Sequence, residues 1–239
     1  RTGARKIECG AVETFMSPEA QAVLGSVAAM LPLPAPGRRV FIGVDGVDGA
    51  GKTTFADALG ARLPGPVVRI SIDGFHRPSR ERYRQGRSSP RGFFEDSYDY
   101  AAFRQLVVDP LRPGRSGRYH AASHDLASDR PVCGPELTAP EPAVVLVDGL
   151  FLHRPELSGI WDATVFLDVS FETSCRRLQR RDGSDPDPRA AANARYVRGQ
   201  EIYLAACDPL AAASVVLDYN DAAAPLILRA SSKGGPRRR

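Results

Sequence analysis

The sequence is poor in cysteine and has no long apolar run. Its 239 residues include four cysteines, and no two of them form a Cys-x-x-Cys pair, which disfavours a zinc site and a disulfide framework. No stretch approaches the about 18 apolar residues of a membrane-spanning helix. The first residues lead into no apolar core of the kind that a signal peptide contains. These absences favour a cytoplasmic protein that makes no membrane contact.

Basic side chains are concentrated at the two ends of the sequence. The formal net charge is +4, but the first eight and last nine residues together carry seven basic side chains and one acidic one. Without them the net charge is −2. Electrostatic binding to DNA normally needs a basic face on the fold. Nucleic-acid binding through the ends therefore remains only an alternative.

Short buried strands alternate with helices along the chain. The run Val40–Val44 is apolar and β-branched, as in a buried strand, and Ser17 followed by Pro18 is typical of a helix start. Strands are predicted at 40–44, 67–72, 143–147, 163–167 and 214–217, and helices at 17–30, 53–63, 98–108, 171–181 and 189–206. A long loop is predicted at 73–97. This alternation predicts an α/β fold with a parallel sheet covered by helices on both faces.

The same features suggest three segments. Residues 1–37 are predicted to be a lead-in and one helix, ended by a proline-rich linker. Residues 38–230 form the main domain, and 231–239 are a basic tail.

Residues 46–53 match the pattern G-x-x-x-x-G-K-[ST] at every fixed position. In this pattern, glycines let backbone N–H groups converge on phosphate oxygens, and the following helix directs its positive end at the same anion. Lys52 can reach the β- and γ-phosphates, and the Thr53 hydroxyl can bind Mg²⁺. An ordinary glycine-rich turn is the alternative, but a buried strand before it and a helix after it favour nucleotide binding. The predicted nucleotide-binding residues are Gly46, Asp48, Gly49, Ala50, Gly51, Lys52, Thr53 and Thr54.

Two aspartates follow predicted strands. The carboxyl ends of parallel strands line the ligand crevice. Asp148 follows the strand 143–147 and can hold Mg²⁺ through water, although it could also cap the next turn. Asp73 follows the strand 67–72 and could accept a proton from a substrate hydroxyl. An Asx-turn, or an ion pair with Arg77 or Arg80, explains Asp73 equally well.

The order of these motifs over roughly residues 38–218 resembles the uridine kinase family, which is grouped with phosphoribulokinases and bacterial pantothenate kinases. The resemblance rests on the phosphate loop, the strand followed by Asp73-Gly74-Phe75, Val147-Asp148-Gly149 and an arginine-rich helix. It implies a P-loop NTPase fold with a small lid, and transfer of the γ-phosphate of ATP, with Mg²⁺, to a nucleoside 5′-hydroxyl. It also implies that Asp73 takes the proton of that hydroxyl.

The resemblance extends to the substrate side. It implies that an acid of the segment 93–99, Asp96 rather than Glu95, holds the ribose hydroxyls. It also implies that Tyr119 and His124, five residues apart, form the nucleobase pocket; a pair of surface-loop residues is the alternative. Phe75 and His76, which follow Asp73, are expected beside the substrate.

The resemblance also implies a lid over about 182–195, preceded by a helix that carries Arg177 and Arg181. These two residues are four apart and share a helix face, from which they would contact the transferring phosphates.

Some positions depart from the family pattern. His76 stands where a tyrosine is usual, and Ser174 where an arginine grips the ribose. Asp148 replaces a glutamate. The expected partners are a nucleoside triphosphate and a small-molecule alcohol. Because of these departures, the alcohol could be pantothenate, a sugar phosphate or a nucleoside of specialised metabolism in place of a nucleoside such as uridine or cytidine. A nucleotide switch is less well supported, because the chain has no Asn-Lys-x-Asp guanine-binding motif; its asparagines are at 193 and 220. A homo-oligomer is left open.

Overall fold

The structure is a computed structural model that describes residues 16–132 and 134–231. The basic side chains at the two ends of the sequence lie outside these ranges. The alternative of nucleic-acid binding through them therefore stays untested.

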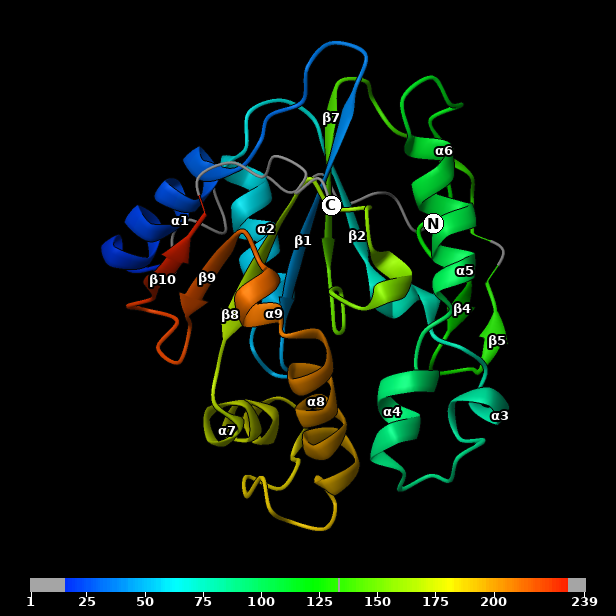
Figure 1. The fold of residues 1–239 in the computed structure, drawn as a ribbon, viewed down its shortest axis with the longest axis vertical. Coiled ribbons are helices and arrows are strands. Elements are labelled where there is room, and N and C mark those ends of the chain that lie inside the picture. Colours follow the sequence, from blue (N-terminus) through cyan, green and yellow to red (C-terminus); the bar gives the residue numbers. More distant parts are fainter. Residues whose placement is uncertain (1–15, 133, 232–239) are drawn as a thin grey trace.

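A six-stranded sheet forms the centre of the molecule, in the order β10-β9-β8-β1-β7-β2 (Figure 1). All neighbouring strands pair in parallel except β10, which runs antiparallel at one edge. The α/β prediction is confirmed, with a mixed, mostly parallel sheet. The strands are β1 (Arg39–Gly46), β2 (Val67–Ser71), β7 (Ala143–Asp148), β8 (Ala163–Asp168), β9 (Val215–Asp218) and β10 (Leu226–Ala230).

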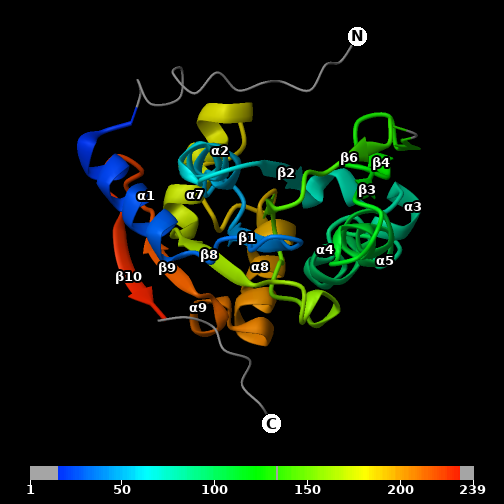
Figure 2. The same ribbon diagram turned by 90° about the horizontal axis from the view of Figure 1, so that it is seen from above.

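Helices cover both faces of the sheet (Figure 2). One face packs against α1 (Pro18–Met30) and α2 (Lys52–Arg62), and the alternate side chains Val40, Ile42 and Val44 of β1 point into this layer. Phe41 points to the opposite face, where the second core lies. Because both faces of the sheet are buried, the central strands are continuous apolar runs in the sequence. This pattern is what predicted them.

The segment predicted as a loop at 73–97 is largely helical. It contains a 3₁₀ turn, η2 (Ile72–Phe75), and two helices, α3 (Ser79–Arg82) and α4 (Pro90–Asp96). Ser89 caps α4, because its hydroxyl accepts a hydrogen bond from Gly92 N at 3.0 Å. The prediction was wrong because arginine, serine and proline were interpreted as loop-formers, whereas Ser-Pro here starts a helix.

The next helical run continues past its predicted end at residue 108. It comprises α5 (Tyr100–Phe103), a π-helical segment η3 (Arg104–Val108) and α6 (Asp109–Leu111). A connecting region follows with two small sheets, β3 (Arg118–Tyr119) with β6 (Leu137–Thr138), and β4 (His124–Asp125) with β5 (Arg130–Pro131).

The last helices are η4 (Pro155–Leu157), α7 (Phe171–Asp182), α8 (Ala194–Cys207) and α9 (Pro209–Ala212). The α8 helix begins five residues later than the predicted start at 189. Side-chain bonds hold the preceding segment in turns: Asn193 Nδ2 donates to the carbonyls of Asp185 and Asp187 at 2.9 and 2.7 Å. Within the described ranges, no helix has both the length and the hydrophobicity needed to cross a bilayer.

Candidate active site

The phosphate loop lies between β1 and α2, as its motif requires. Gly51 has a φ of +91°, and a Cβ on Gly46 would lie 2.8 Å from the carbonyl oxygen of Leu167. Other residues would strain or displace the backbone at these points. Lys52 Nζ donates to Val47 O at 2.8 Å, so the lysine folds back over the loop.

Carboxylates surround Lys52. Burial lowers the pKa of its ammonium group, and the negative charges of Asp48, Asp45, Asp73 and Asp148 act in the opposite direction. The lysine is thus the positive centre of a site whose acidic groups come from the ends of three strands and from the loop. A polyphosphate with its metal ion is a ligand that such mixed charges can hold.

Two helices hold the loop from outside. The Ser174 hydroxyl of α7 donates to Asp48 O at 2.6 Å, and Asp48 N donates to Gln200 Oε1 of α8 at the same distance. Ser174, which departs from the family pattern, therefore contacts the phosphate loop.

The two predicted lid-helix arginines have different surroundings. Arg177 donates to the carbonyls of Ala50 at 3.0 Å and Tyr219 at 2.8 Å, so its guanidinium is engaged with the main chain beside the loop. Arg181 is 61% exposed, and its guanidinium lies 3.8 Å from Asp48 Oδ1. Arg181 also pairs with Asp182 at 2.9 Å, and of the two arginines it is the more exposed.

Thr53 and Asp148 form a pair of oxygen donors. Thr53 Oγ1 donates to Asp148 Oδ2 at 2.7 Å, while Arg69 donates to Asp148 Oδ1 at 2.9 Å and to Asp57 Oδ1 at 2.9 Å. Hydroxyl and carboxylate oxygens are the donors that Mg²⁺ prefers, and Mg²⁺ usually takes its other ligands from phosphates and water. The two residues therefore fit Mg²⁺. Arg69, which sequence reasoning did not single out, fixes the orientation of the carboxylate.

Asp73 borders a cavity of about 440 Å³, together with Asp48, His76 and Arg181. Its Oδ1 accepts a hydrogen bond from the buried Tyr98 hydroxyl at 2.8 Å. Burial raises the pKa of Tyr98 well above its ordinary value, and the negative charge of Asp73 adds to this rise. The tyrosine therefore remains a donor, and the other carboxylate oxygen of Asp73 stays available to the cavity.

His76 stands beside Asp73. Its Nδ1 lies 2.8 Å from Asp73 O, and its ring lies against that of Tyr98, with 4.5 Å between centroids. Burial lowers the pKa of His76. A neutral ring that donates from Nδ1 to the carbonyl leaves Nε2 as an acceptor.

Four of the predicted substrate residues do not line this cavity. Phe75 has 0% exposure and packs edge-on against Phe103, so it belongs to the core beneath the site. Tyr119 in β3 is likewise in the core. His124 in β4 is 5% exposed, and its Nε2 lies 3.3 Å from Asp129 Oδ1. For Phe75 and Tyr119, the physical reason is that large aromatic side chains contribute more by burial than at a surface.

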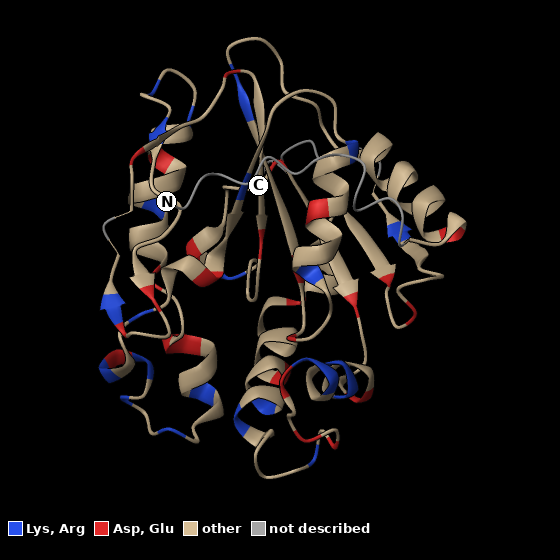
Figure 3. Ribbon diagram, turned by 180° about the vertical axis from the view of Figure 1, so that it is seen from behind, with Lys and Arg blue, Asp and Glu red and all other residues tan. Residues whose placement is uncertain are grey.

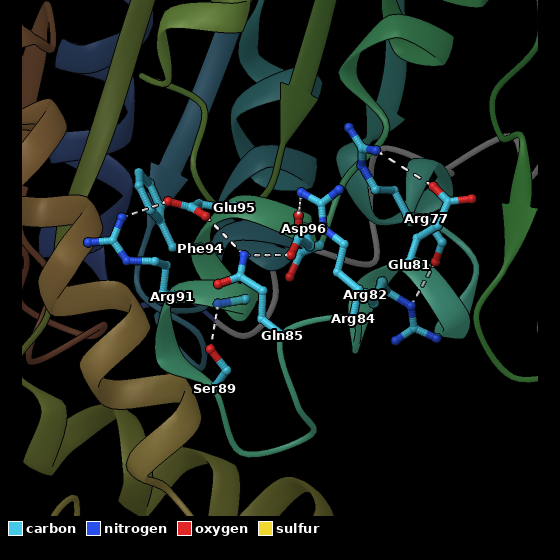
Figure 4. A network of polar contacts seen from close by, with 12 residues as sticks. Arg77, Glu81, Arg82, Arg84, Gln85, Ser89, Arg91, Phe94, Glu95 and Asp96 are labelled. Carbon is cyan, nitrogen blue, oxygen red and sulfur yellow. Dashed lines mark hydrogen bonds and ion pairs between the residues drawn. The ribbon is translucent and has the colours of Figure 1, made fainter.

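Asp96 is the fourth of these residues. It ends α4 and is 1% exposed. Its carboxylate lies 2.5 Å from a guanidinium nitrogen of Arg84 and accepts from Gln85 Nε2 at 2.8 Å (Figure 4). The aspartate is therefore already paired within the α3–α4 segment.

Sequence reasoning missed Arg82 and Tyr83, which line the cavity, and did not assign Arg195 and Tyr196, which also line it, to the site. The arginine-rich stretch 77–91 and the Arg-Tyr pair in α8 were visible as patterns. Only tertiary packing brings them together, because Arg195 of α8 donates to the carbonyls of Arg82, Gly86 and Ser89.

No family model matches the sequence. It is 30% identical over 148 residues to human nicotinamide riboside kinase 1, an alignment that covers 61% of this chain and 67% of that protein. Mouse nicotinamide riboside kinase 1 is 30% identical over 155 residues, which cover 63% of this chain and 71% of that protein.

Two solved structures share the fold. A protein described as a possible uridine kinase from Bacillus stearothermophilus has a TM-score of 0.62 at 20% identity, and the match covers 83% of this chain and 97% of that one. A protein from Silicibacter assigned as a fructose transport system kinase has a TM-score of 0.60 at 27% identity, and the match covers 78% and 94%.

Proposed function

The chain belongs to the uridine kinase-like family of P-loop kinases, and on that premise we propose that it transfers the γ-phosphate of ATP to the 5′-hydroxyl of a nucleoside. It is a phosphotransferase that acts on an alcohol group of a small molecule. The nucleoside acceptor is supported by the names of the relatives, which are kinases of a riboside.

One observation carries the proposal. Asp73 and the phosphate-loop residue Asp48 border the same cavity, and the negative charges of both raise the pKa of Lys52 against the effect of its burial. A hydroxyl placed in this cavity would lie between the Asp73 carboxylate and the end of a phosphate chain held by the loop. Such positioning supplies most of the catalysis of phosphoryl transfer.

The residues divide the reaction between them. The loop N–H groups and Lys52 bind the phosphates, and Thr53 with Asp148 would hold Mg²⁺, which neutralises developing charge on the phosphate oxygens. Asp73 orients the acceptor hydroxyl. As the new P–O bond forms and the bond from the γ-phosphorus to the bridging oxygen of ADP breaks, the hydroxyl proton moves to the Asp73 carboxylate. Arg181 closes on the transferring group, where added positive charge stabilises the transition state.

An ADP-release assay with ATP and Mg²⁺ tests the proposal. The acceptor panel contains uridine, cytidine, nicotinamide riboside, pantothenate and sugar phosphates, and mass spectrometry identifies each product. We expect acceptor-dependent ADP release, reduced at least about 10²-fold in Lys52→Ala because a charge at the phosphates is lost. Near wild-type turnover in Lys52→Ala would rule out the phosphate-loop assignment. ADP release that no acceptor accelerates would favour a nucleotide switch.

A further inference from the structure

Three arginine side chains converge on the ring of Tyr83. The guanidinium carbons of Arg87, Arg195 and Arg82 lie 4.5, 5.0 and 5.2 Å from the ring centroid. Arg82 belongs to α3, Arg195 to α8, and Arg87 to the segment between α3 and α4. Figure 3 shows Lys and Arg gathered on these elements and on α7. Three parts of the chain thus direct positive charge at one ring.

Two of these guanidinium groups are largely buried and border the cavity of Asp73. Arg195 is 7% exposed and the Arg82 side chain 12% exposed, and both line the cavity with Tyr83. Of the carboxylates that line it, Asp48 already faces Arg181 and Asp73 accepts from Tyr98. The acceptor cavity therefore has the carboxylates of Asp48 and Asp73, each with a partner of its own, and the arginines Arg82 and Arg195 elsewhere in its wall.

The buried arginines have little negative charge of their own. In the described part of the chain Arg195 forms no ion pair, and its N–H groups donate to the carbonyls of Ser89 at 2.9 Å, Gly86 at 3.2 Å and Arg82 at 3.3 Å. Arg82 has one carboxylate contact, with Asp129 at 3.5 Å, and donates to a main-chain carbonyl. Burial lowers the pKa of Arg195 and the charge of Arg82 lowers it further, whereas Tyr196, Tyr83 and the carboxylate of Asp96, which is paired with Arg84, act in the opposite direction.

Burying like charges together costs free energy unless an opposite charge joins them. Neutral carbonyls and an aromatic face compensate only in part. A phosphate or a carboxylate accepts two N–H bonds from one guanidinium and matches its planar geometry. An anion in the cavity would therefore supply the missing charge at the position where the acceptor must bind.

We infer that the acceptor alcohol carries a phosphate or carboxylate group, bound by Arg82 and Arg195 with Arg87 beside them, while its hydroxyl faces Asp73. The inference rests on the proposed phosphoryl transfer to a small-molecule alcohol and restricts the acceptor to alcohols that carry an anionic group, of which a nucleotide with a free 5′-hydroxyl is one. A neutral nucleoside would leave the arginines unmatched. Nicotinamide riboside, whose ring bears a positive charge, would be repelled by them.

Matched acceptor pairs test the inference directly. Uridine is compared with uridine 3′-monophosphate, and panthenol with pantothenate; within each pair the reactive hydroxyl is the same and only one member is an anion. We expect the anionic member to have the higher kcat/KM by about 10–100-fold, the range expected for a charge-assisted hydrogen bond. The first pair reports on phosphate and the second on carboxylate.

Variants identify the side chain responsible. In Arg82→Gln we expect kcat/KM for the anionic acceptor to fall about 10–100-fold while KM for ATP stays within about twofold, and Arg82→Lys to recover part of the loss. Arg80→Gln is the matched control, because it removes one positive charge from the same helix at a side chain that is 84% exposed and paired with Glu81. A rise in KM for ATP in Arg82→Gln would instead assign Arg82 to the nucleotide and overturn the inference.

Calorimetry without ATP separates this inference from the proposed function. Uridine 3′-monophosphate and pantothenate are titrated into the full chain and into Arg82→Gln. Binding that depends on Arg82, together with no product in the separate ADP-release assay with ATP and Mg²⁺, would support the anion site and contradict the proposed transfer. Equal or better use of the neutral members of both pairs would overturn the inference and leave the proposed transfer intact. Failure of both anions to bind and to react would also overturn it.

Discussion

One carboxylate oxygen of Asp73 accepts a hydrogen bond from the protein, and the other is available to a substrate hydroxyl. Tyr98 donates to Oδ1 at 2.8 Å, and an asparagine could accept the same hydrogen bond. We therefore predict that Asp73→Asn folds normally but has a kcat reduced about 10²–10⁴-fold, the usual effect of losing a general base. KM for ATP should hardly change, because Lys52 and the loop amides bind the nucleotide.

Turnover and melting temperature, measured on one preparation of Asp73→Asn, decide whether Asp73 is the general base or a structural residue. Asp109→Asn is the control, since that carboxylate is 61% exposed and contacts only Arg112, at 3.6 Å, among its ion pairs in the described residues. A destabilised Asp73→Asn protein with full activity per folded molecule would mean that Asp73 is structural. His76 would then be the next candidate for the base.

His76 makes stability depend on pH. Its pKa is lowered in the folded protein by burial, so the unfolded chain binds a proton more readily as the pH falls below about 6.5. The contribution of this group is therefore complete above about pH 6.5 and is lost as the pH falls from there towards the folded pKa. We predict that urea midpoints at pH 7.5 and pH 5 differ less in His76→Gln than in the wild type. The same difference in both proteins would contradict this assignment.

Single residues were predictable where local spacing defines them. The phosphate loop has fixed spacing, and Asp148 and Asp73 each follow a recognisable strand. The sequence therefore predicted that both aspartates lie near the phosphate loop at one edge of the sheet. Phe75 and Tyr119 could not be placed correctly, because an aromatic side chain beside a site and one in the core beneath it look the same in a sequence. Arg82 and Arg195 meet only through tertiary packing, which no local pattern contains.

Among the elements, the segment between α7 and α8 is the proposed lid. It lacks regular structure over 183–193 and is held by bonds from Asn193 to the carbonyls of Asp185 and Asp187. Those bonds tie the segment to itself. Closure over a bound nucleotide would bring Arg181 towards the phosphates.

Hydrogen exchange measures this closure. We predict that peptides covering 182–195 gain protection when a non-hydrolysable ATP analogue binds, whereas peptides from the buried strand β8 do not change. Asn193→Ala should exchange faster without nucleotide, because its two carbonyl contacts are lost. Equal protection of the segment with and without the analogue would argue against a lid.

Elements differ in how far sequence predicts them. The central strands β1, β7, β8 and β9 were found because a strand covered on both faces must be apolar throughout. The edge strand β2 alternates between half-buried and buried residues, and its β-branched run identified it. The edge strand β10 was missed; its residues alternate between exposed and half-buried, and a β-bulge interrupts its pairing with β9 between Ile227 and Arg229. The helices α3 and α4 have 4 and 7 residues, too short to show helical periodicity.

At the scale of the whole molecule, α8 connects the parts of the site. It packs against α4, which carries one wall of the acceptor cavity, and it holds the phosphate loop through Gln200 (Figure 1). One turn further along, the Tyr203 hydroxyl donates to Asp45 Oδ2 in β1. A single helix thus sets the position of the acceptor wall relative to the loop that binds the nucleotide.

Tyr203 shows how much of this arrangement depends on a buried polar contact. Asp45 has 0% exposure, and besides Tyr203 it accepts hydrogen bonds from Gly46 N at 2.7 Å and Leu152 N at 3.1 Å, while His153 Nδ1 lies 2.8 Å from its Oδ2. Burial raises the pKa of Tyr203 well above its ordinary value, and the charge of Asp45 contributes. The hydroxyl therefore remains protonated and donates to a buried carboxylate, which needs such a partner.

We predict that Tyr203→Phe lowers the free energy of unfolding by about 1–3 kcal/mol, because a buried charge loses one hydrogen bond. The melting temperature should fall by roughly 2–12 °C for a chain of this length. Tyr219→Phe is the control for stability, since its hydroxyl has no hydrogen-bond partner among the described residues while its ring packs edge-on against Phe55. Because Asp45 keeps its other donors, kcat per folded Tyr203→Phe molecule should stay within about twofold of the wild type. An unchanged melting temperature would mean that α8 is fixed to the sheet by apolar packing alone, and that the hydroxyl of Tyr203 contributes no net stability.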